Sequence, residues 1–308
     1  MRKIIKKILI ILLIIIILAV STVSIYIFIE NKRCDFISQE NMRIQYYYSL
    51  ERYISCAEKS GIIIEEEIKV NIRKDIKKFV RKIDNDYMLR PIETFSLARL
   101  ISVVAFFEVD TDYQFLIDLL HSRYDEEDKL FSNGIWSRSE SDNNIVIVTL
   151  YDTDVDISMA DDYIIDRINN LESYSNTDFS NDITCLYLMN SVDQVDINRF
   201  RDYVYERLES VNEDFINYDY VPLYMLACIY NDSVMEQQMY ESLTNTYKDL
   251  TIYPSFFESV DGFVYFTSFV CVDEYDFDYY DENAEFVANA NSNLKKIMKI
   301  AENELMRY

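Results

Sequence analysis

The chain has 308 residues, in which 54 Asp and Glu outnumber 30 Lys and Arg, so the formal net charge is −24. A surface this negative repels nucleic acid phosphates, and a single histidine excludes the usual zinc sites and paired-histidine chemistry, so any bound cation is expected to have oxygen ligands. Three glycines and three prolines are too few for the frequent turns of an all-β domain, so the chain is predicted to be all-α.

An apolar segment runs from Ile8 to Ile29 without a charged side chain. At about 1.5 Å per residue it spans the roughly 30 Å core of a bilayer, which predicts an uncleaved transmembrane helix. A cleaved signal peptide is the alternative, but the apolar run continues past the weak cleavage positions Ala19, Ser21 and Ser24. Four cations precede the segment and two follow it, which predicts a single-pass protein of the cell membrane with a cytoplasmic N-terminus.

A change in composition near Arg90 and Pro91 predicts where the next domain begins. Residues 31–90 contain 13 Lys and Arg against 10 Asp and Glu, whereas residues 91–308 contain 13 against 43. Two amphipathic helices are expected in the first segment, over residues 38–59 and 62–83, with Gly61 ending the first. The second has a basic face and an apolar stripe, namely Ile68, Ile72, Ile76, Phe79 and Ile83.

These boundaries predict three parts: a cytoplasmic stub and transmembrane anchor (1–30), a membrane-proximal helical pair (31–90) and an acidic extracytoplasmic domain (91–308). The basic face of the pair is expected either near the bilayer or docked on the acidic domain, and the charge difference favours docking. The five cysteines form no CxxC pair, so no disulfide framework is indicated. Cys185, Cys228 and Cys271 lie in apolar runs and are expected to be free.

The acidic domain repeats one pattern, in which an apolar helix, a short acidic turn and an amphipathic helix follow one another. Copies begin at Glu93, Asn143, Asn181, Asp219 and Asp261, which gives intervals of 50, 38, 38 and 42 residues. Because the first helix of each copy is apolar nearly all round, it is expected to be buried between neighbours. The pattern predicts helical-hairpin repeats that form either an open α-solenoid or a closed α/α toroid.

The first copy reads ETFSLARLISVVAFF and then YQFLIDLLHSRYDEEDKLFSNGIW. It resembles the α/α-toroid repeat of terpenoid cyclases and prenyltransferases, in which an Asp-rich turn ends in a Gly-Leu-Phe-like step. The resemblance covers about residues 92–271 and implies a toroid fold. The chain departs from that pattern at Lys129, where the family usually has glycine.

The sequence YDTDVD places three aspartates, Asp152, Asp154 and Asp156, in the turn of the second copy. An EF-hand is excluded because Ile157 and Tyr163 replace its glycine and glutamate. A looser calcium site that also uses Asp161 or Asp162 is a candidate. The other copies have acids at the same junction, so the main hypothesis is that they accept hydrogen bonds from free amides at a helix start; Asp112, Asp156 and Asp196 are in position to do so, and Ser233 with Glu236 matches a capping box.

Two further features bear on binding. The loop between the first and second copies contains the single tryptophan, Trp136, which with Phe131 and Arg138 is a candidate contact for a partner; alternatively Trp136 fills the gap between the copies. His121 is expected at the exposed C-terminal end of a helix, and no nucleophile motif accompanies it.

The leading hypothesis is a membrane-anchored binding or scaffold module at the cell surface, without catalysis of its own, whose partner is a basic protein or an envelope glycan. Calcium is the single candidate cofactor. The alternative is an α/α-toroid enzyme that acts on an envelope polysaccharide or lipid with paired carboxylates. A central cavity lined by Glu93, Trp136, Asp182 and Asp219 would favour the enzyme.

Overall fold

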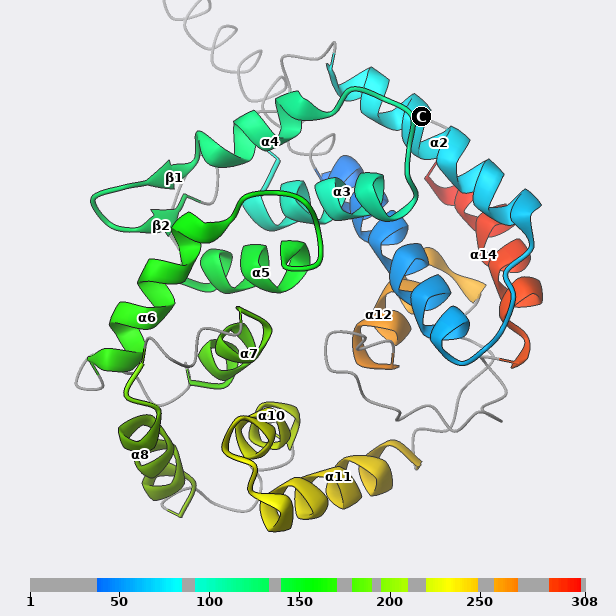
Figure 1. Ribbon diagram of the computed structural model, residues 1–308. Helices are drawn as coiled ribbons and strands as arrows, with labels where there is room; N and C mark the ends of the chain where they lie inside the picture. The colour runs from blue at the N-terminus through cyan, green and yellow to red at the C-terminus, as the bar shows by residue number, and fades with distance from the viewer. Residues whose placement is uncertain are drawn as a thin grey trace, which may run out of the picture. The chain divides into compact units, whose positions relative to one another are not determined.

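The computed structural model describes residues 38–84, 92–132, 140–170, 179–189, 195–209, 220–248, 258–270 and 288–305 (Figure 1). These residues are mostly helical, which confirms the all-α prediction. Contacts divide the chain into two compact units, residues 1–42 and 43–308. The predicted anchor, residues 8–29, lies outside the described ranges, and no helix inside them is both long and apolar enough to span a bilayer.

The first described helix covers residues 38–59, and its part from residue 43 onward belongs to the second unit. The elements that follow are α2 (Glu66–Asp84), α3 (Thr94–Phe106), α4 (Gln114–His121), β1 (Tyr124–Asp125), β2 (Leu130–Phe131), α5 (Glu140–Leu150), the 3-10 helix η2 (Ser158–Ala160), α6 (Asp161–Asn169), α7 (Phe179–Met189), α8 (Ile197–Glu209), α10 (Tyr220–Tyr230), α11 (Ser233–Lys248), α12 (Val260–Val270) and α14 (Ala290–Glu304).

The helices predicted to be buried form the core of the second unit. α3 packs against α5, α5 against α7, and α7 against α10. Their sequences are apolar with little preference for one side, so each helix can be covered from several directions. The amphipathic helices cover this core: α4 packs on α3, α6 on α7, and α11 on α10.

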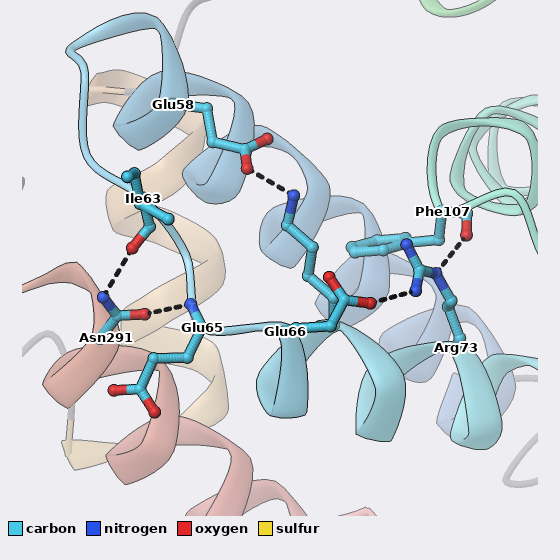
Figure 2. Close-up of polar contacts among 8 residues, drawn as sticks. Glu58, Ile63, Glu65, Glu66, Arg73, Phe107 and Asn291 are labelled. Carbon is cyan, nitrogen blue, oxygen red and sulfur yellow. Dashed lines mark hydrogen bonds and ion pairs between the residues drawn. The ribbon is translucent and has the colours of Figure 1, made fainter.

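Helix α2 is amphipathic as predicted, and its stripe of Ile68, Ile72, Ile76, Phe79 and Ile83 is buried. The basic side docks on the acidic domain. Arg73 donates from Nε to the carbonyl oxygen of Phe107 at 2.9 Å, where α3 ends (Figure 2). Lys77 forms an ion pair with Asp110 at 2.7 Å, which lowers the pKa of that carboxyl. A cation at a helix C-terminus also interacts favourably with the helix dipole.

The 43–59 helix contacts both the first and the last predicted repeats. On one side Ser102 of α3 donates its hydroxyl to Glu51 at 2.7 Å. On another side the ring of Tyr53 meets Phe263 of α12 edge-on, with centroids 5.8 Å apart, and its hydroxyl accepts from Asn293 of α14 at 3.0 Å. One helix therefore holds together segments that are far apart in the sequence.

The loop that joins this helix to α2 is fixed by the C-terminal helix. Gly61 adopts a positive φ of 78°, as expected for the residue that ends the helix. Asn291 of α14 donates to the carbonyl oxygen of Ile63 at 3.0 Å and accepts from the amide of Glu65 at 2.9 Å (Figure 2). α14 and α2 therefore pack side by side, with Lys295 paired to Glu65.

A two-stranded antiparallel ladder between β1 and β2 follows α4 and was not predicted. The side-chain amide of Asn143, in α5, forms two hydrogen bonds with the backbone of this ladder. It accepts from the backbone amide of Phe131 at 2.7 Å and donates to the carbonyl oxygen of Lys129 at 2.8 Å. Lys129 has a φ of 55°, a left-handed conformation that favours glycine.

A buried ion pair joins α6 and α7. The guanidinium of Arg167 is 3.0 Å from the carboxylate of Asp182, which is fully buried. The same carboxylate accepts from the side-chain amide of Asn144 at 3.0 Å. Three helices, α5, α6 and α7, are thereby tied through one carboxylate. The sequence suggests Asp182 as a residue that would line a central cavity, but its burial removes it from contact with a substrate.

We expect Asp182→Ala to reduce the free energy of unfolding by about 3–5 kcal/mol, because it leaves a buried guanidinium without its counter-charge. Urea unfolding of the full chain followed by circular dichroism measures this. The control is Asp166→Ala, which removes the exposed partner of Lys129 and should cost less than about 1 kcal/mol. Equal losses in the two variants would show that the buried pair has no special role.

Candidate functional site

A pocket of about 330 Å³ opens between the 43–59 helix and the C-terminal ends of α3 and α5. The helix contributes Tyr48, Glu51, Arg52, Ser55 and Lys59; α3 and α5 contribute Ser102, Ala105, Phe106, Val148 and Thr149; and the turn after α5 contributes Tyr151, Asp152, Thr153 and Asp154. Two of the three aspartates of YDTDVD therefore line this pocket.

The 43–59 helix presents its polar residues to the pocket on one face, spaced three or four positions apart. Tyr48 is held between two cations: the guanidinium carbons of Arg52 and Arg99 are 5.4 and 5.1 Å from its ring centroid. Arg52 also donates to the hydroxyl of Tyr48 at 2.9 Å. These contacts fix the orientation of an aromatic ring at the wall of the pocket.

The turn after α5 differs from the ends of the neighbouring helices. α3 and α10 end in a residue of positive φ, Glu108 and Asn231, which reverses the chain at once. After α5, Thr153 donates its hydroxyl to the carbonyl oxygen of Leu150 at 2.7 Å instead, and it accepts from the amide of Val155. Because the threonine closes this wider turn, the exposed side chains of Asp152 and Asp154 remain at the rim of the pocket.

The lining combines carboxylates, hydroxyls and aromatic rings. Glu51 is half-buried, whereas Asp152 and Asp154 are exposed, and the basic lining residues are Arg52 and Lys59. Two helices, α3 and α5, end at the pocket, and helix C-termini carry partial negative charge. The arrangement is therefore suited to a small group that carries a positive charge or several hydroxyls and that stacks on an aromatic ring.

Aspartates at four helix starts accept hydrogen bonds from backbone amides, as the leading interpretation of the acidic turns expects. Asp112 accepts from Gln114 at 3.1 Å and Asp156 from Ser158 at 3.1 Å. Asp196 and Asp232 each accept from the amide three residues on, at 3.2 Å, where α8 and α11 begin. The capping residue of α11 is thus Asp232, not Ser233, because the helix begins at Ser233, one residue earlier than the capping box requires.

Asp156 has a different role from Asp152 and Asp154. It accepts from both the hydroxyl and the amide of Ser158, and these bonds lower the pKa of its carboxyl. Its carbonyl oxygen accepts from Nε2 of His121 at 2.9 Å, so the single histidine joins the end of α4 to this turn. The carboxylate and the backbone carbonyl of Asp156 thus both accept hydrogen bonds from other residues of the fold.

Asp161 and Asp162 lie at the start of α6 and differ in exposure. Asp162 is exposed, as expected for solvated surface, but Asp161 is half-buried. Its burial, and then the charges of Asp162 and Asp156, raise its pKa from 3.8 to about 6. Asp161 is therefore not an ordinary surface carboxylate.

Within the described ranges, no three carboxylate, thiol or imidazole groups are close enough together to hold a metal ion. Asp152, Asp154 and Asp156 accordingly do not form a ready ligand set. Calcium binding by these residues stays a prediction. Asp161 offers a probe of this prediction, because the charges of Asp162 and Asp156 act on it.

The predicted contact loop is described only in part. Phe131 is fully buried, with its ring edge-on to Tyr124 at 5.2 Å, and therefore belongs to the core rather than to a contact surface. Trp136 and Arg138 lie outside the described residues, so their role stays a prediction.

Glu51, Arg52 and Ser55 line the pocket but were not predicted as site residues. The sequence does contain a pattern that indicates them, because these residues and Lys59 form one polar strip beside the apolar face of a helix. The sequence does not indicate that α3 and the turn after α5 line a pocket together with that strip.

We expect Asp196→Ala and Asp232→Ala each to lower the free energy of unfolding by about 1 kcal/mol, because a helix-start amide loses its acceptor. The corresponding Asn variants should keep most of the stability. Asp154→Ala is the control and should change it by less than about 0.5 kcal/mol. If Asp154→Ala destabilised the chain as much as Asp232→Ala, the division of roles among the aspartates would be wrong.

Asp161→Asn should stabilise the protein above about pH 6 but not near pH 4. The folded-state pKa of Asp161 is raised, so the wild type loses stability as the pH rises from about 4 to 6, when the folded state must release the proton that it retains. After allowance for its half-exposed position, the expected gain is about 1 kcal/mol. Thermal melting at both pH values measures it.

The same assay tests calcium. If Asp156, Asp161 and Asp162 bind the ion, millimolar calcium raises the melting temperature of the wild type, and it raises the melting temperature of Asp161→Asn less. An unchanged wild-type melting curve would remove the calcium site. A gain from Asp161→Asn that is the same at both pH values would contradict the raised pKa.

Comparison with known proteins gives no assignment, since the chain matches no family model, no curated protein and no solved structure. The resemblance to toroid repeats therefore rests on the residues of the first copy alone. The arrangement of side chains around the pocket is what remains to indicate a function.

Proposed function

We propose that this protein is a membrane-anchored binding module of the cell surface, whose pocket takes an ammonium or guanidinium group of a basic partner. The observation that carries the proposal is the pocket itself, where Glu51, Asp152 and Asp154 lie around the C-terminal ends of two helices. Carboxylates and helix C-termini both favour a cation.

The charge of the chain supports the same partner. Residues 91–308 contain 43 Asp and Glu against 13 Lys and Arg, so an approaching basic protein is attracted over a wide surface. Of the two cations of the lining, Arg52 opposes this only weakly. Arg52 is directed to Tyr48, where its charge is partly satisfied by the ring and the hydroxyl.

The architecture proposed for this module is an array of helical-hairpin repeats of the α/α-toroid type. The alternation of core and covering helices along residues 94–304 supports it. So does Lys129, whose left-handed backbone occurs where the toroid repeat usually has glycine. The contacts of the 43–59 helix with both α3 and α12 favour a closed array over an open solenoid.

The location is proposed from the sequence. An apolar run from Ile8 to Ile29 with more cations before it than after it supports a single-pass anchor with the acidic domain outside the cell.

The test uses a short lysine peptide and the paired variant Asp152→Asn/Asp154→Asn. Losing two partly exposed carboxylates at about 0.5–1 kcal/mol each should weaken peptide binding by about tenfold, as measured by calorimetry at physiological salt. The matched control, Asp118→Asn/Asp202→Asn, removes the same charge from exposed positions outside the pocket and should change affinity less than about threefold.

A glutamate peptide should not bind at all. Equal losses in the two paired variants would reduce the effect to general charge attraction and remove the pocket from the proposal.

The alternative is an enzyme acting on an envelope polysaccharide with paired carboxylates. One observation favours it: the pocket contains a half-buried glutamate, Glu51, together with the exposed Asp152 and Asp154, and glycoside hydrolysis uses two carboxyl groups that flank the scissile bond. Release of reducing ends from cell-wall glycan by the wild type but not by Glu51→Gln would establish it. Peptide binding without glycan cleavage would leave the binding module.

A further inference from the structure

Helix α2 has two cationic sides, and the docking contacts described above use only one. Arg73 and Lys77 face the acidic domain and are half-buried. Lys74, Lys78 and Lys82 are exposed, and their spacing places them along the outward side of the same helix, whereas the exposed Arg81 lies between the two sides and its charge also acts on Asp110. This outward stripe continues towards the N-terminus through Asn71 and Val70, also exposed.

The stripe contains no exposed carboxylate between Val70 and Lys82. The one acid in that interval, Asp75, is half-buried, and burial raises the pKa of its carboxyl while Lys78 lowers it. Four cations thus lie together on the surface of a chain whose formal net charge is −24. Such a separation of charge within one protein favours an anionic surface as the partner of this side.

Exposed apolar side chains accompany the cations. Val70 is 49% exposed on α2 itself, and Ile63, in the loop that leads into α2, is 87% exposed. A helix with cations and accessible apolar groups on its outward side has the chemistry that binds at the interface of a bilayer.

We propose that the outward stripe of α2, Lys74, Lys78 and Lys82, binds the headgroups of anionic phospholipids. This goes beyond the proposed pocket, which takes a cation, and does not depend on it. The acidic domain is repelled by the same headgroups, so the two effects together would turn α2 towards the bilayer and the acidic surface away from it.

A second copy of the chain is the rival partner, because its acidic domain would also attract the stripe. Two observations favour lipid. The exposed Val70 and Ile63 suit a bilayer interface better than a carboxylate-rich surface. The anchor predicted from residues 8–29 would also keep the chain at a membrane at all times, whereas contact with a second copy depends on concentration.

The full chain is placed in lipid discs of phosphatidylcholine alone or with roughly one third phosphatidylglycerol, and lysine acetylation rates are read by mass spectrometry. We expect labelling of Lys74, Lys78 and Lys82 to slow at least about threefold in the anionic discs, since each cation near an anionic leaflet strengthens association by about fivefold. Lys129, on the acidic domain, should label equally in both. About 0.5 M NaCl should abolish the difference, since screening shortens the range to ~4 Å.

The variant Lys74→Gln/Lys78→Gln separates contact from a general surface effect. It should return the labelling of Lys82 towards the rate in neutral discs, whereas the control Lys129→Gln/Lys248→Gln should not. Equal labelling of the stripe in both kinds of disc would overturn the proposal. So would protection that depends on protein concentration and not on phosphatidylglycerol, which would assign the stripe to a second copy.

If the full chain stays soluble without detergent, a second assay measures its flotation with vesicles of the same two lipid compositions. Flotation with the anionic vesicles alone, lost in Lys74→Gln/Lys78→Gln, is expected. Absence of flotation with either composition would overturn the proposal while leaving peptide binding at the pocket unaffected.

Discussion

The contact on which the rest of the second unit depends is the burial of the 43–59 helix. Its aromatic side reaches α2 through Tyr47 and Phe79, and α12 through Tyr53 and Phe263. Its polar side meets α3 through Glu51 and Ser102. One helix therefore contacts elements that lie far apart in the sequence. The same helix forms one wall of the pocket, so stability and the candidate site share a single element.

The acidic turns show how one residue type serves different purposes at equivalent positions. Asp112, Asp196 and Asp232 are committed to backbone amides at helix starts. In the YDTDVD turn only Asp156 has that role, since Thr153 closes the turn and leaves Asp152 and Asp154 to the pocket. The extra aspartates of this copy are therefore not needed for its local structure. Side chains that the fold does not use are the ones that remain for binding.

Charge is also divided, and α2 marks the division. One side of this helix neutralises part of the acidic domain through Lys77 and Asp110, which fixes the helix in place. The outward side keeps its cations exposed. A strongly acidic domain and one basic helix face attract partners of opposite charge, so an anionic surface and a basic partner would meet different parts of this protein. The pocket and the stripe on α2 are therefore suited to ligands of opposite charge, and neither depends on the other.

The sequence by itself determined the helical class, the positions of the helices and most of the buried faces, because apolar spacing and the scarcity of glycine and proline are local properties. It also indicated the aspartates at helix starts, since a cap and its amide are neighbours in the chain. The tertiary structure alone decided that Phe131 is core and that Asp182 is buried against Arg167. It also decided that Glu51 lies opposite Asp152 and Asp154 across a pocket. These facts depend on which helices pack together, and contacts between residues far apart in the sequence leave no periodic pattern to read.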